Sequence, residues 1–308
     1  MNQPEAARAA SIGFFDGVHR GHQYLVQQVT AEAQRRNLEP LLITFAQHPA
    51  TVLRPDVQMP LLTTPEEKAE LLHKLGVERI EMLRFDHELA QLSAAEFMRS
   101  VLRDRLGVSV LVMGYDHHFG HDRGLSFADY VALGKEIGIE VVHAGELAAP
   151  DLPNRSISSS LIRRALAAGD LQLANQCLGY EYFLRGKVVG GLQLGRKLGY
   201  PTANIRPGSD GKLLPRRGVY AVDVCIEGHE TARGMLNIGT RPTLQHTDAA
   251  AQTAQQQSIE VHIFDFHQDI YSENIEIRFR KFIREEREFP TLELLQKQLA
   301  RDEQACRQ

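Results

Sequence analysis

The chain carries two different patterns of hydrophobic and polar positions. In the first half, short apolar runs such as Val108–Met113 alternate with segments such as Leu25–Ala33, in which apolar residues recur every three or four positions. Buried strands that alternate with amphipathic helices are typical of a parallel sheet with helices on both faces. We therefore predict a doubly wound α/β domain over residues 1–180.

Local signals mark the elements of this first domain. Thr64-Pro65-Glu66-Glu67 predicts a helix start, because proline suits the first helical position and acidic residues suit the first turn. Ser93–Glu96 has the spacing of a capping box, which predicts another helix start. The expected strands are 10–15, 40–45, 77–83, 108–113 and 139–142, and the expected helices end near residues 37, 76, 106, 137 and 168.

Alternation with period two takes over after about Tyr180. Glycine and proline become frequent there, and the next helical pattern is Thr291–Arg301. This predicts an antiparallel β-barrel or sandwich with a C-terminal helix over residues 181–308, and Asp248–Gln257 is expected to be a loop rich in alanine and glutamine. The clearest alternating segments are Val219–Val224, Ile259–Phe264 and Ile275–Phe279.

Composition narrows the classes of function. The 308 residues are 43% hydrophobic and 24% charged, which suits two soluble domains with their own cores, and the net charge of −4 disfavours a nucleic-acid partner. Cys177, Cys225 and Cys306 are too few and too far apart for a disulfide framework, which fits a cytoplasmic protein. No apolar run reaches the roughly 18 residues of a membrane span, and the N-terminus lacks the apolar region of a signal peptide, so no membrane partner is expected.

The segment Gly13–His22, GFFDGVHRGH, lies between the first expected strand and the first expected helix. Ligands of open α/β sheets bind beyond the carboxyl ends of the strands, and a helix N-terminus attracts phosphate. Gly17 and Gly21 let the backbone approach a ligand, and His19 and His22 can donate hydrogen bonds to phosphoryl oxygens. Two histidines at this spacing are more often a solvated turn, but the position after the first strand favours a phosphate site.

Three further segments are expected at the same edge of the sheet: Thr44–Pro49, Gly114–Gly120 and Ser158–Arg163. The serines of the last segment suit helix capping or phosphate binding, and its arginine suits phosphate. A metal site is the alternative for the cluster Asp116, His117, His118 and His121. Neighbours in one loop rarely complete a coordination shell, so a polar loop that lines a nucleotide pocket is favoured.

A second group of motifs lies in the β-rich half. Gly190–Lys197 lacks the GK[ST] ending of a P-loop and is better explained as a flap whose backbone N–H groups close over phosphates. Thr202 and Asn204 would share one face of an extended segment, and their oxygens suit Mg²⁺; a turn with satisfied polar groups is the alternative. Glu260 lies between apolar neighbours and either faces solvent or acts as a general base.

These motifs resemble those of the bacterial bifunctional riboflavin kinase/FAD synthetase family. GFFDGVHRGH, TFAQHP, GYDHHFG and SSSLIR are similar to motifs of its FMN adenylyltransferase module, in the same order. GRKLGYPTANI, RRGVYAV, LNIGTRPT, IEVHIFDF and IREEREF are similar to blocks of its riboflavin kinase module. The resemblance covers about residues 10–302.

The resemblance implies a fold and two reactions. A C-terminal six-stranded Greek-key barrel would phosphorylate riboflavin to FMN with ATP. An N-terminal nucleotidyltransferase domain would adenylylate FMN to FAD with a second ATP and release pyrophosphate. ATP would be the co-substrate and Mg²⁺ the metal at both sites, and the protein is expected to be a monomer or a weak homo-oligomer.

The resemblance also implies site residues. His19 and His22 would stabilise the transferring phosphates, Glu260 would deprotonate the 5′-hydroxyl of riboflavin, and Thr202 and Asn204 would bind Mg²⁺. The nucleotide and flavin of the adenylyltransferase would contact Gly13, Phe15, Asp16, Gly17, Gly21, His48, Asp116, Ser159, Ser160 and Arg163. Those of the kinase would contact Gly186, Gly195, Arg196, Gly199, Asn237, Arg284 and Phe289.

The chain departs from the family pattern mainly in the adenylyltransferase loops. Ser160 stands where threonine is usual, His117 replaces an aromatic residue, HDRGL differs from the usual loop, and Phe14 is larger than is typical. The alternatives are a protein with one active module, another nucleotidyltransferase, and a non-catalytic flavin-binding protein. The PTAN segment argues against the second, and the retained catalytic residues argue against the third.

Overall fold

The computed structural model describes residues 7–54, 56, 59–114, 119–121, 124–153, 156–191, 194–240 and 257–308. The chain forms two compact units, Met1–Ser159 and Ser160–Gln308. The second unit takes in the two helices that precede residue 180: Asn175 Nδ2 donates to the carbonyl oxygen of Phe279 at 3.0 Å. The boundary between the functional modules, expected between residues 180 and 181, stays a prediction.

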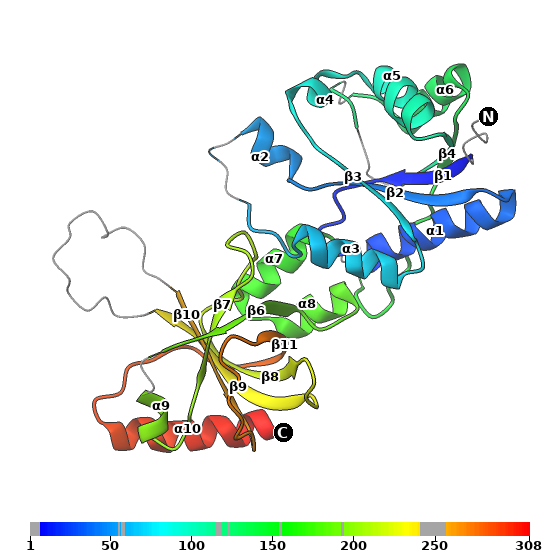
Figure 1. Ribbon diagram of the computed structural model, residues 1–308. Coiled ribbons are helices and arrows are strands. Elements are labelled where there is room, and N and C mark those ends of the chain that lie inside the picture. Colours follow the sequence, from blue (N-terminus) through cyan, green and yellow to red (C-terminus); the bar gives the residue numbers. More distant parts are fainter. Residues whose placement is uncertain are drawn as a thin grey trace. The chain divides into compact units, whose positions relative to one another are not determined.

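The first unit is built on a parallel sheet with the strand order β3-β2-β1-β4-β5 (Figure 1). The order reverses between β1 and β4, and a reversal of this kind marks the ligand crevice of open α/β sheets. The strands are β1 (Arg8–Ile12), β2 (Glu39–Phe45), β3 (Arg79–Leu83), β4 (Val108–Met113) and β5 (Glu140–His143).

Helices cover both faces of this sheet, which confirms the predicted doubly wound α/β fold. Figure 1 shows α1 and α3 on one side and α5 and α6 on the other. On the first side Val29 and Leu72 pack with Leu42, and on the second Met98 packs with Leu111. The helices are α1 (Arg20–Arg36), α2 (Pro49–Leu53), α3 (Pro65–Lys74), α4 (His87–Gln91), α5 (Ala94–Glu96), the π-helix η1 (Phe97–Arg105) and α6 (Phe127–Ile137).

The second unit is a closed antiparallel barrel with the strand order β10-β7-β6-β11-β8-β9. This decides between the predicted barrel and sandwich in favour of the barrel, and the crossovers from β7 to β8 and from β10 to β11 are those of a Greek key. The strands are β6 (Phe183–Val189), β7 (Ala203–Pro207), β8 (Gly218–Ile226), β9 (Ala232–Thr240), β10 (Gln257–Ile263) and β11 (Asn274–Arg284), and the helices are α7 (Ser159–Ala168), α8 (Leu171–Leu178), α9 (Leu194–Lys197) and α10 (Leu292–Arg307).

The C-terminal helix α10 packs on the barrel and runs farther than predicted. Cys306, beyond the expected end at Arg301, is buried in a cluster with Val219, Ala221 and Met235, so the last turn is held by apolar contacts. Most of the loop expected over Asp248–Gln257 lies outside the described residues, and Gln257 itself begins β10.

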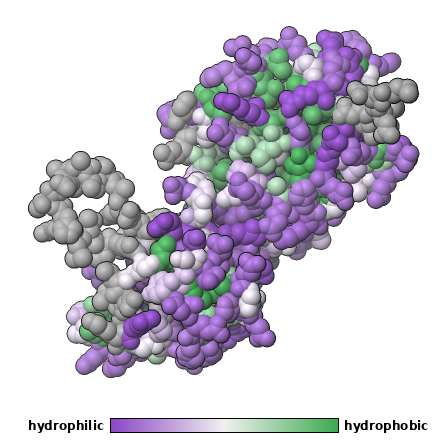
Figure 2. Space-filling model, in the orientation of Figure 1, coloured by the Kyte–Doolittle hydropathy of each residue, from purple (hydrophilic) through white to green (hydrophobic). Residues whose placement is uncertain are grey.

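Hydrophilic residues cover most of the visible surface, and the hydrophobic surface of the first unit gathers around β2 and β3 (Figure 2). Among the helices in the described ranges, none has the length and apolar character of a membrane span.

Candidate active sites

The loop between β1 and α1 turns through an unusual backbone conformation. Phe15, Gly17 and Val18 have φ angles of 53°, 79° and 36°. For residues with a side chain, and above all for a β-branched one, this region costs about 1–3 kcal/mol and persists only where the surroundings impose it. Phe15 and Val18 are buried with the core beneath α1, and this turn is the reason that the strand expected over 10–15 ends at Ile12.

The carboxylate of Asp16 holds this loop from within. Its Oδ1 accepts the backbone N–H groups of Leu62 at 2.9 Å and Thr63 at 3.1 Å. Thr63 Oγ1 in turn accepts the N–H of Gly17 at 3.0 Å, and Ser159 Oγ donates to the carbonyl oxygen of Asp16 at 2.9 Å. Asp16 is only 3% exposed, so these contacts favour a role in positioning the loop; its expected contact with nucleotide or flavin stays a prediction.

His19 caps the N-terminus of α1 and stacks on His22. Its Nδ1 accepts the N–H of His22 at 3.3 Å, and the two ring centroids lie 3.6 Å apart. A ring nitrogen that accepts a hydrogen bond carries no proton, so a neutral His19 has its proton on Nε2. The N–H of His19 Nε2 and the positive end of the α1 dipole are thus both available at this helix N-terminus, which suits an anionic group.

At two positions of this loop, close packing leaves little space for a residue larger than glycine. A Cβ added at Gly21 would lie 3.2 Å from the ring of His19, and one added at Gly13 would lie 3.1 Å from the ring of Phe15. Larger residues would displace both rings. Gly13, Phe15, Asp16, Gly17, Gly21, His19, His22, His48 and Ser159 are called the sheet-edge site below.

Phe14 lies between His48 and a buried lysine. The rings of Phe14 and His48 meet edge to face at 4.6 Å, and Lys68 Nζ lies 4.3 Å from the centroid of the Phe14 ring. Lys68 is 2% exposed and donates to the carbonyl oxygens of Phe14 at 3.0 Å and Phe45 at 2.7 Å. Sequence reasoning missed Lys68, because a lysine in the acidic first turn of a helix normally faces solvent.

Burial gives Lys68 a pH-dependent effect on stability. It lowers the pKa of this ammonium from 10.5 to about 8, against the opposing effect of the Asp16 carboxylate. Between these two pH values Lys68 binds a proton in the unfolded chain but not in the folded chain, so the free energy of unfolding rises with pH. The stabilising contribution of Lys68 is therefore fully present above pH 10.5 and is lost as the pH falls through 8.

We therefore predict that wild type gains stability over Lys68→Met as the pH rises from 7 to 10. The expected gain is about 2–3 kcal/mol, since each pKa unit corresponds to about 1.4 kcal/mol. Calorimetric unfolding of both proteins at pH 7, 8, 9 and 10 measures it. Lys74→Met, at an exposed position of the same helix, is the control, and a difference that stays constant with pH contradicts the assignment.

The remaining residues expected at the sheet edge fall into three groups: one in the first unit, two in the second unit and three outside the described residues. Ser159 joins the loop through Asp16, as above, whereas Ser160 and Arg163 belong to the second compact unit. Ser160 is exposed and Arg163 half-buried at the start of α7. Asp116, His117 and His118 lie outside the described residues. Within the described part of the chain, no three His, Cys, Asp or Glu side chains are grouped to hold a metal ion.

Three strands of the barrel present a row of polar side chains. Glu260 of β10 pairs in register with Asn204 of β7 and with Asn237 of β9, and residues opposite one another project from the same face. Thr202 Oγ1 donates to Glu260 Oε2 at 3.2 Å. Glu260 is half-buried while its two sequence neighbours are buried, so it faces away from the barrel core and into this row. Thr202, Asn204, Asn237 and Glu260 are called the barrel site.

The glycine-rich segment between β6 and β7 lies against the barrel site. A Cβ added at Gly191 would lie 2.0 Å from Asn204 Nδ2, and one at Gly195 would lie 2.1 Å from the carbonyl oxygen of Tyr200. Gly186 is also too closely packed for a side chain, because an added Cβ would lie 2.4 Å from the carbonyl oxygen of Arg206. Gly199 has a φ of 83°, a conformation that favours glycine. These glycines shape the segment; their expected contacts with nucleotide stay predictions.

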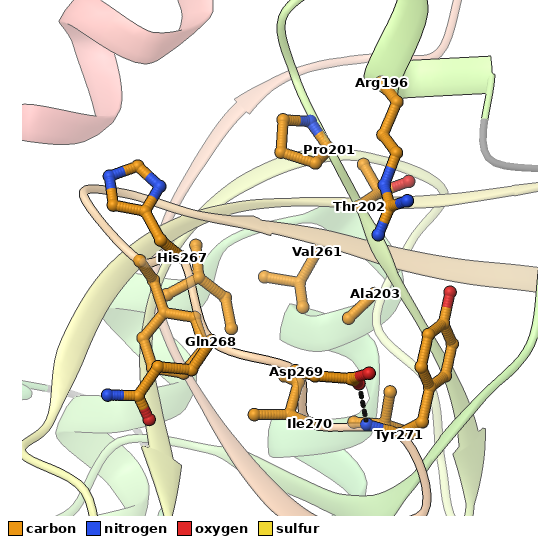
Figure 3. A pocket seen from close by; sticks show the side chains of 13 residues that line it. Arg196, Pro201, Thr202, Ala203, Val261, His267, Gln268, Asp269, Ile270 and Tyr271 are labelled. Atoms are coloured by element: carbon orange, nitrogen blue, oxygen red, sulfur yellow. Dashed lines mark hydrogen bonds between the residues drawn. The ribbon is translucent and has the colours of Figure 1, made fainter.

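A pocket of about 190 Å³ adjoins the barrel site and shares Thr202 with it. Residues 266–271 line one wall of the pocket. Figure 3 shows Arg196 reaching in from above toward residues 267–271 of this wall, where Asp269 accepts the N–H of Tyr271 at 3.0 Å. Val188 and Val261 add apolar surface. The polar lining consists of the side chains of Arg196, Thr202, His267, Gln268, Asp269 and Tyr271. Apolar walls suit an apolar ring, and the Arg196 guanidinium beside the Thr202 hydroxyl suits an anionic group at that end of the pocket. Sequence reasoning missed the wall 266–271, because no local pattern in this segment distinguishes it from an ordinary connection between two strands.

Arg284 and Phe289 come together, but Arg284 is engaged with α10. Its Nε donates to Asp302 Oδ2 at 2.9 Å and its Nη2 to the same oxygen at 2.7 Å, while Asp302 is 2% exposed. The guanidinium also lies 5.7 Å from the ring of Phe289. The pair ties α10 to the barrel, and the expected contacts of Arg284 and Phe289 with flavin stay predictions.

The segment that follows β11 also reaches the barrel site. A Cβ added at Gly239 would lie 2.1 Å from Glu286 Oε1 and 2.9 Å from Asn237 Nδ2, so both side chains flank the same glycine. Asn237 is thus near the C-terminal segment, and its expected contact with flavin stays a prediction.

Two family models match the chain, each over one part. The model described as FAD synthetase matches residues 2–161, which include the sheet-edge site. The model described as riboflavin kinase matches residues 178–308, which include the barrel site.

Curated relatives match almost the whole chain. Proteins named bifunctional riboflavin kinase/FMN adenylyltransferase are 36% identical over 305 residues in Escherichia coli strain K12 and 35% identical over 306 residues in Bacillus subtilis strain 168, with 99% of this chain and 93% of each relative covered. The protein of that name from Listeria monocytogenes is 38% identical over 301 residues, with 97% of this chain and 91% of the relative covered.

A solved structure has the same fold over its length. It is described as a macrolide-efflux protein from Streptococcus pneumoniae, and it superimposes with a TM-score of 0.87 at 31% identity, covering 99% of this chain and 95% of its own. Its description differs from the names of the curated relatives, and the likeness to it supports the arrangement of an α/β unit followed by a barrel.

Proposed function

The chain belongs to the family of bifunctional riboflavin kinase/FMN adenylyltransferases, and from this premise we propose how its residues divide the two reactions. Its C-terminal part is a riboflavin kinase and its N-terminal part an FMN adenylyltransferase, and both use ATP. The observation that carries the assignment of residues is the barrel site, where Thr202, Asn204 and Glu260 converge beside a pocket.

In the kinase reaction Glu260 is the general base. It accepts a hydrogen bond from Thr202, and it removes the proton of the riboflavin 5′-hydroxyl as that oxygen attacks the γ-phosphorus of ATP. ADP leaves, and the phosphoryl group stays on the flavin as FMN. ATP occupies the pocket, with Arg196 and Thr202 near its phosphates.

Thr202 and Asn204 fit a magnesium ion. The Thr202 hydroxyl gives its hydrogen to Glu260 and keeps its oxygen lone pairs, and the amide of Asn204 offers a second hard oxygen on the same face. Bound there, Mg²⁺ supplies neutralisation of the phosphate charge. The two side chains would hold the ion, and Glu260 would remain available for the proton.

In the adenylyltransferase reaction the protein neutralises charge and removes no proton. A phosphate oxygen of FMN is already ionised; it attacks the α-phosphorus of ATP, a new P–O–P link forms, and pyrophosphate leaves. His19 Nε2–H, His22 and the N-terminus of α1 stabilise the charge that builds up on the phosphate oxygens. Asp16 and Ser159 hold the loop that carries them.

We predict that Thr202→Val changes the magnesium dependence of the kinase alone. Valine keeps the shape of threonine but removes the oxygen, so the Mg²⁺ concentration for half-maximal FMN formation should rise at least about tenfold, a loss of about 1.4 kcal/mol. Titration of both activities with Mg²⁺ measures this.

Two comparisons make that result specific. Thr202→Ser keeps the hydroxyl and should behave as wild type, and FAD formation from FMN should keep its magnesium dependence in both variants. A wild-type magnesium curve for FMN formation in Thr202→Val argues against Thr202 as a ligand. The expected monomer or weak homo-oligomer and the expected cytoplasmic location stay predictions.

A further inference from the structure

Lys68 is a buried cation behind the sheet-edge site, and the mechanism above does not use it. An ammonium has three N–H donors. Two meet the carbonyl oxygens of Phe14 and Phe45, and the face of the Phe14 ring lies 4.3 Å from Nζ. Asp16 is the carboxylate whose charge acts on it. Moving a charged group from water into the protein interior is costly even when it is hydrogen-bonded, so a buried lysine at this place suggests a role beyond packing.

The contacts of Lys68 join the two loops that carry the histidines. Phe14 begins the loop to His19 and His22, and Phe45 ends the strand that leads to His48. The carbonyl oxygen of Phe14 accepts from both Lys68 Nζ and Thr44 Oγ1, the latter at 3.1 Å. One ammonium therefore fixes the start of the first loop against the end of β2.

This loop needs such support, because its backbone is strained. The φ angles of 53° at Phe15 and 36° at Val18 persist only where neighbours impose them. Asp16 holds the loop through Leu62 and Thr63, just before α3, and Lys68 holds it from the first turns of α3 itself. The segment 62–68 thus supplies both anchors.

We propose that Lys68 is a positioning residue of adenylyl transfer. It fixes Phe14, and through the ring of Phe14 it fixes His48; its positive charge also lies behind the loop that meets the phosphates of ATP. This inference rests on the proposed placement of adenylyl transfer at the sheet-edge site. It also gives a reason for the large side chain of Phe14, since a smaller side chain would lose the ring contacts with Lys68 and His48.

The test uses the full chain and compares Lys68→Met with wild type. Methionine keeps the length of the side chain and removes its charge and donors. A loop that binds the phosphates of ATP in the ground state and the transition state alike loses affinity for both when its anchor is removed. The KM for ATP in FAD formation should therefore rise at least about tenfold, and kcat should fall less. The rate of FMN formation from riboflavin in the same protein should stay within about twofold of wild type, and Lys74→Met should match wild type in both.

A second variant tests the link through the ring. Phe14→Leu leaves the charge of Lys68 in place but removes the contact with His48, so it should slow FAD formation as well. Because the two residues act through one contact, the double variant should lose less than the product of the single losses.

Two results would overturn the role of Lys68. One is a wild-type KM for ATP in Lys68→Met; the other is an equal loss of both activities, which a general loss of folded protein explains. Failure of the proposed function is a separate result, in which the unmodified chain forms no FAD from FMN.

Discussion

Glu260→Gln should lower the rate of conversion of riboflavin to FMN by a factor of about 10²–10⁴ and leave the rate of conversion of FMN to FAD unchanged. Glutamine has the shape of glutamate and can still accept the hydrogen bond from Thr202, so the row with Asn204 and Asn237 is preserved. It cannot take the proton of the 5′-hydroxyl. Initial rates measured separately from riboflavin and from FMN give both numbers.

A matched control comes from Glu227, which is exposed in the turn between β8 and β9. Glu227→Gln removes the same charge from the same unit and should leave both rates unchanged. Loss of both activities in Glu260→Gln would contradict the division of labour between the two units, and FMN formation near the wild-type rate would contradict the role of Glu260 as base.

The second large effect is expected at the histidines of α1. His22→Ala should slow FAD formation from FMN at least about tenfold, which corresponds to about 1.4 kcal/mol of lost transition-state stabilisation. The ring of His22 lies on that of His19, so its loss removes a donor and also frees His19 to move. The rate of FMN formation should not change.

His19 has two tasks that a second variant separates. His19→Asn keeps an N-cap acceptor, because asparagine is among the preferred N-cap residues, but it removes the Nε2–H donor. The rate of FAD formation in this variant should therefore fall at least about tenfold, while the first unit stays folded. His87→Ala, at an exposed position on α4, is the control. FAD formation near the wild-type rate in both histidine variants would exclude the phosphate role.

Much of the fold could be predicted, because the two hydrophobic periods report burial directly. Residues 108–113 form the buried strand β4, and the capping box expected at Ser93 is present. The helix start expected at Thr64 is also present, and the structure adds a capping box there. The end of the first strand could not be predicted. It depends on the left-handed backbone of Phe15, which contacts from Leu62 and Thr63 to Asp16 impose, and these residues are far away in sequence.

The barrel site was predictable by residue type and spacing, but its arrangement was not. Spacing places Thr202 and Asn204 on one face, yet only the register of β10 decides that Glu260 joins them. Lys68 could not be found in this way: its burial depends on carbonyl oxygens at Phe14 and Phe45, which no local pattern around residue 68 encodes.

Residues of a motif do not all meet the ligand. Asp16 and Gly186 were expected in the nucleotide sites, and the structure shows each of them in contact with its own chain. A motif thus also contains the residues that shape a loop, and spacing alone does not separate the two kinds.

The most direct test of the account is a time course of flavins, separated by chromatography, after the purified protein receives riboflavin, ATP and Mg²⁺. We predict that FMN appears first and that FAD follows as FMN is consumed. FMN that accumulates without FAD would show that the sheet-edge site is inactive, and riboflavin that stays unchanged would contradict the roles assigned to both sites.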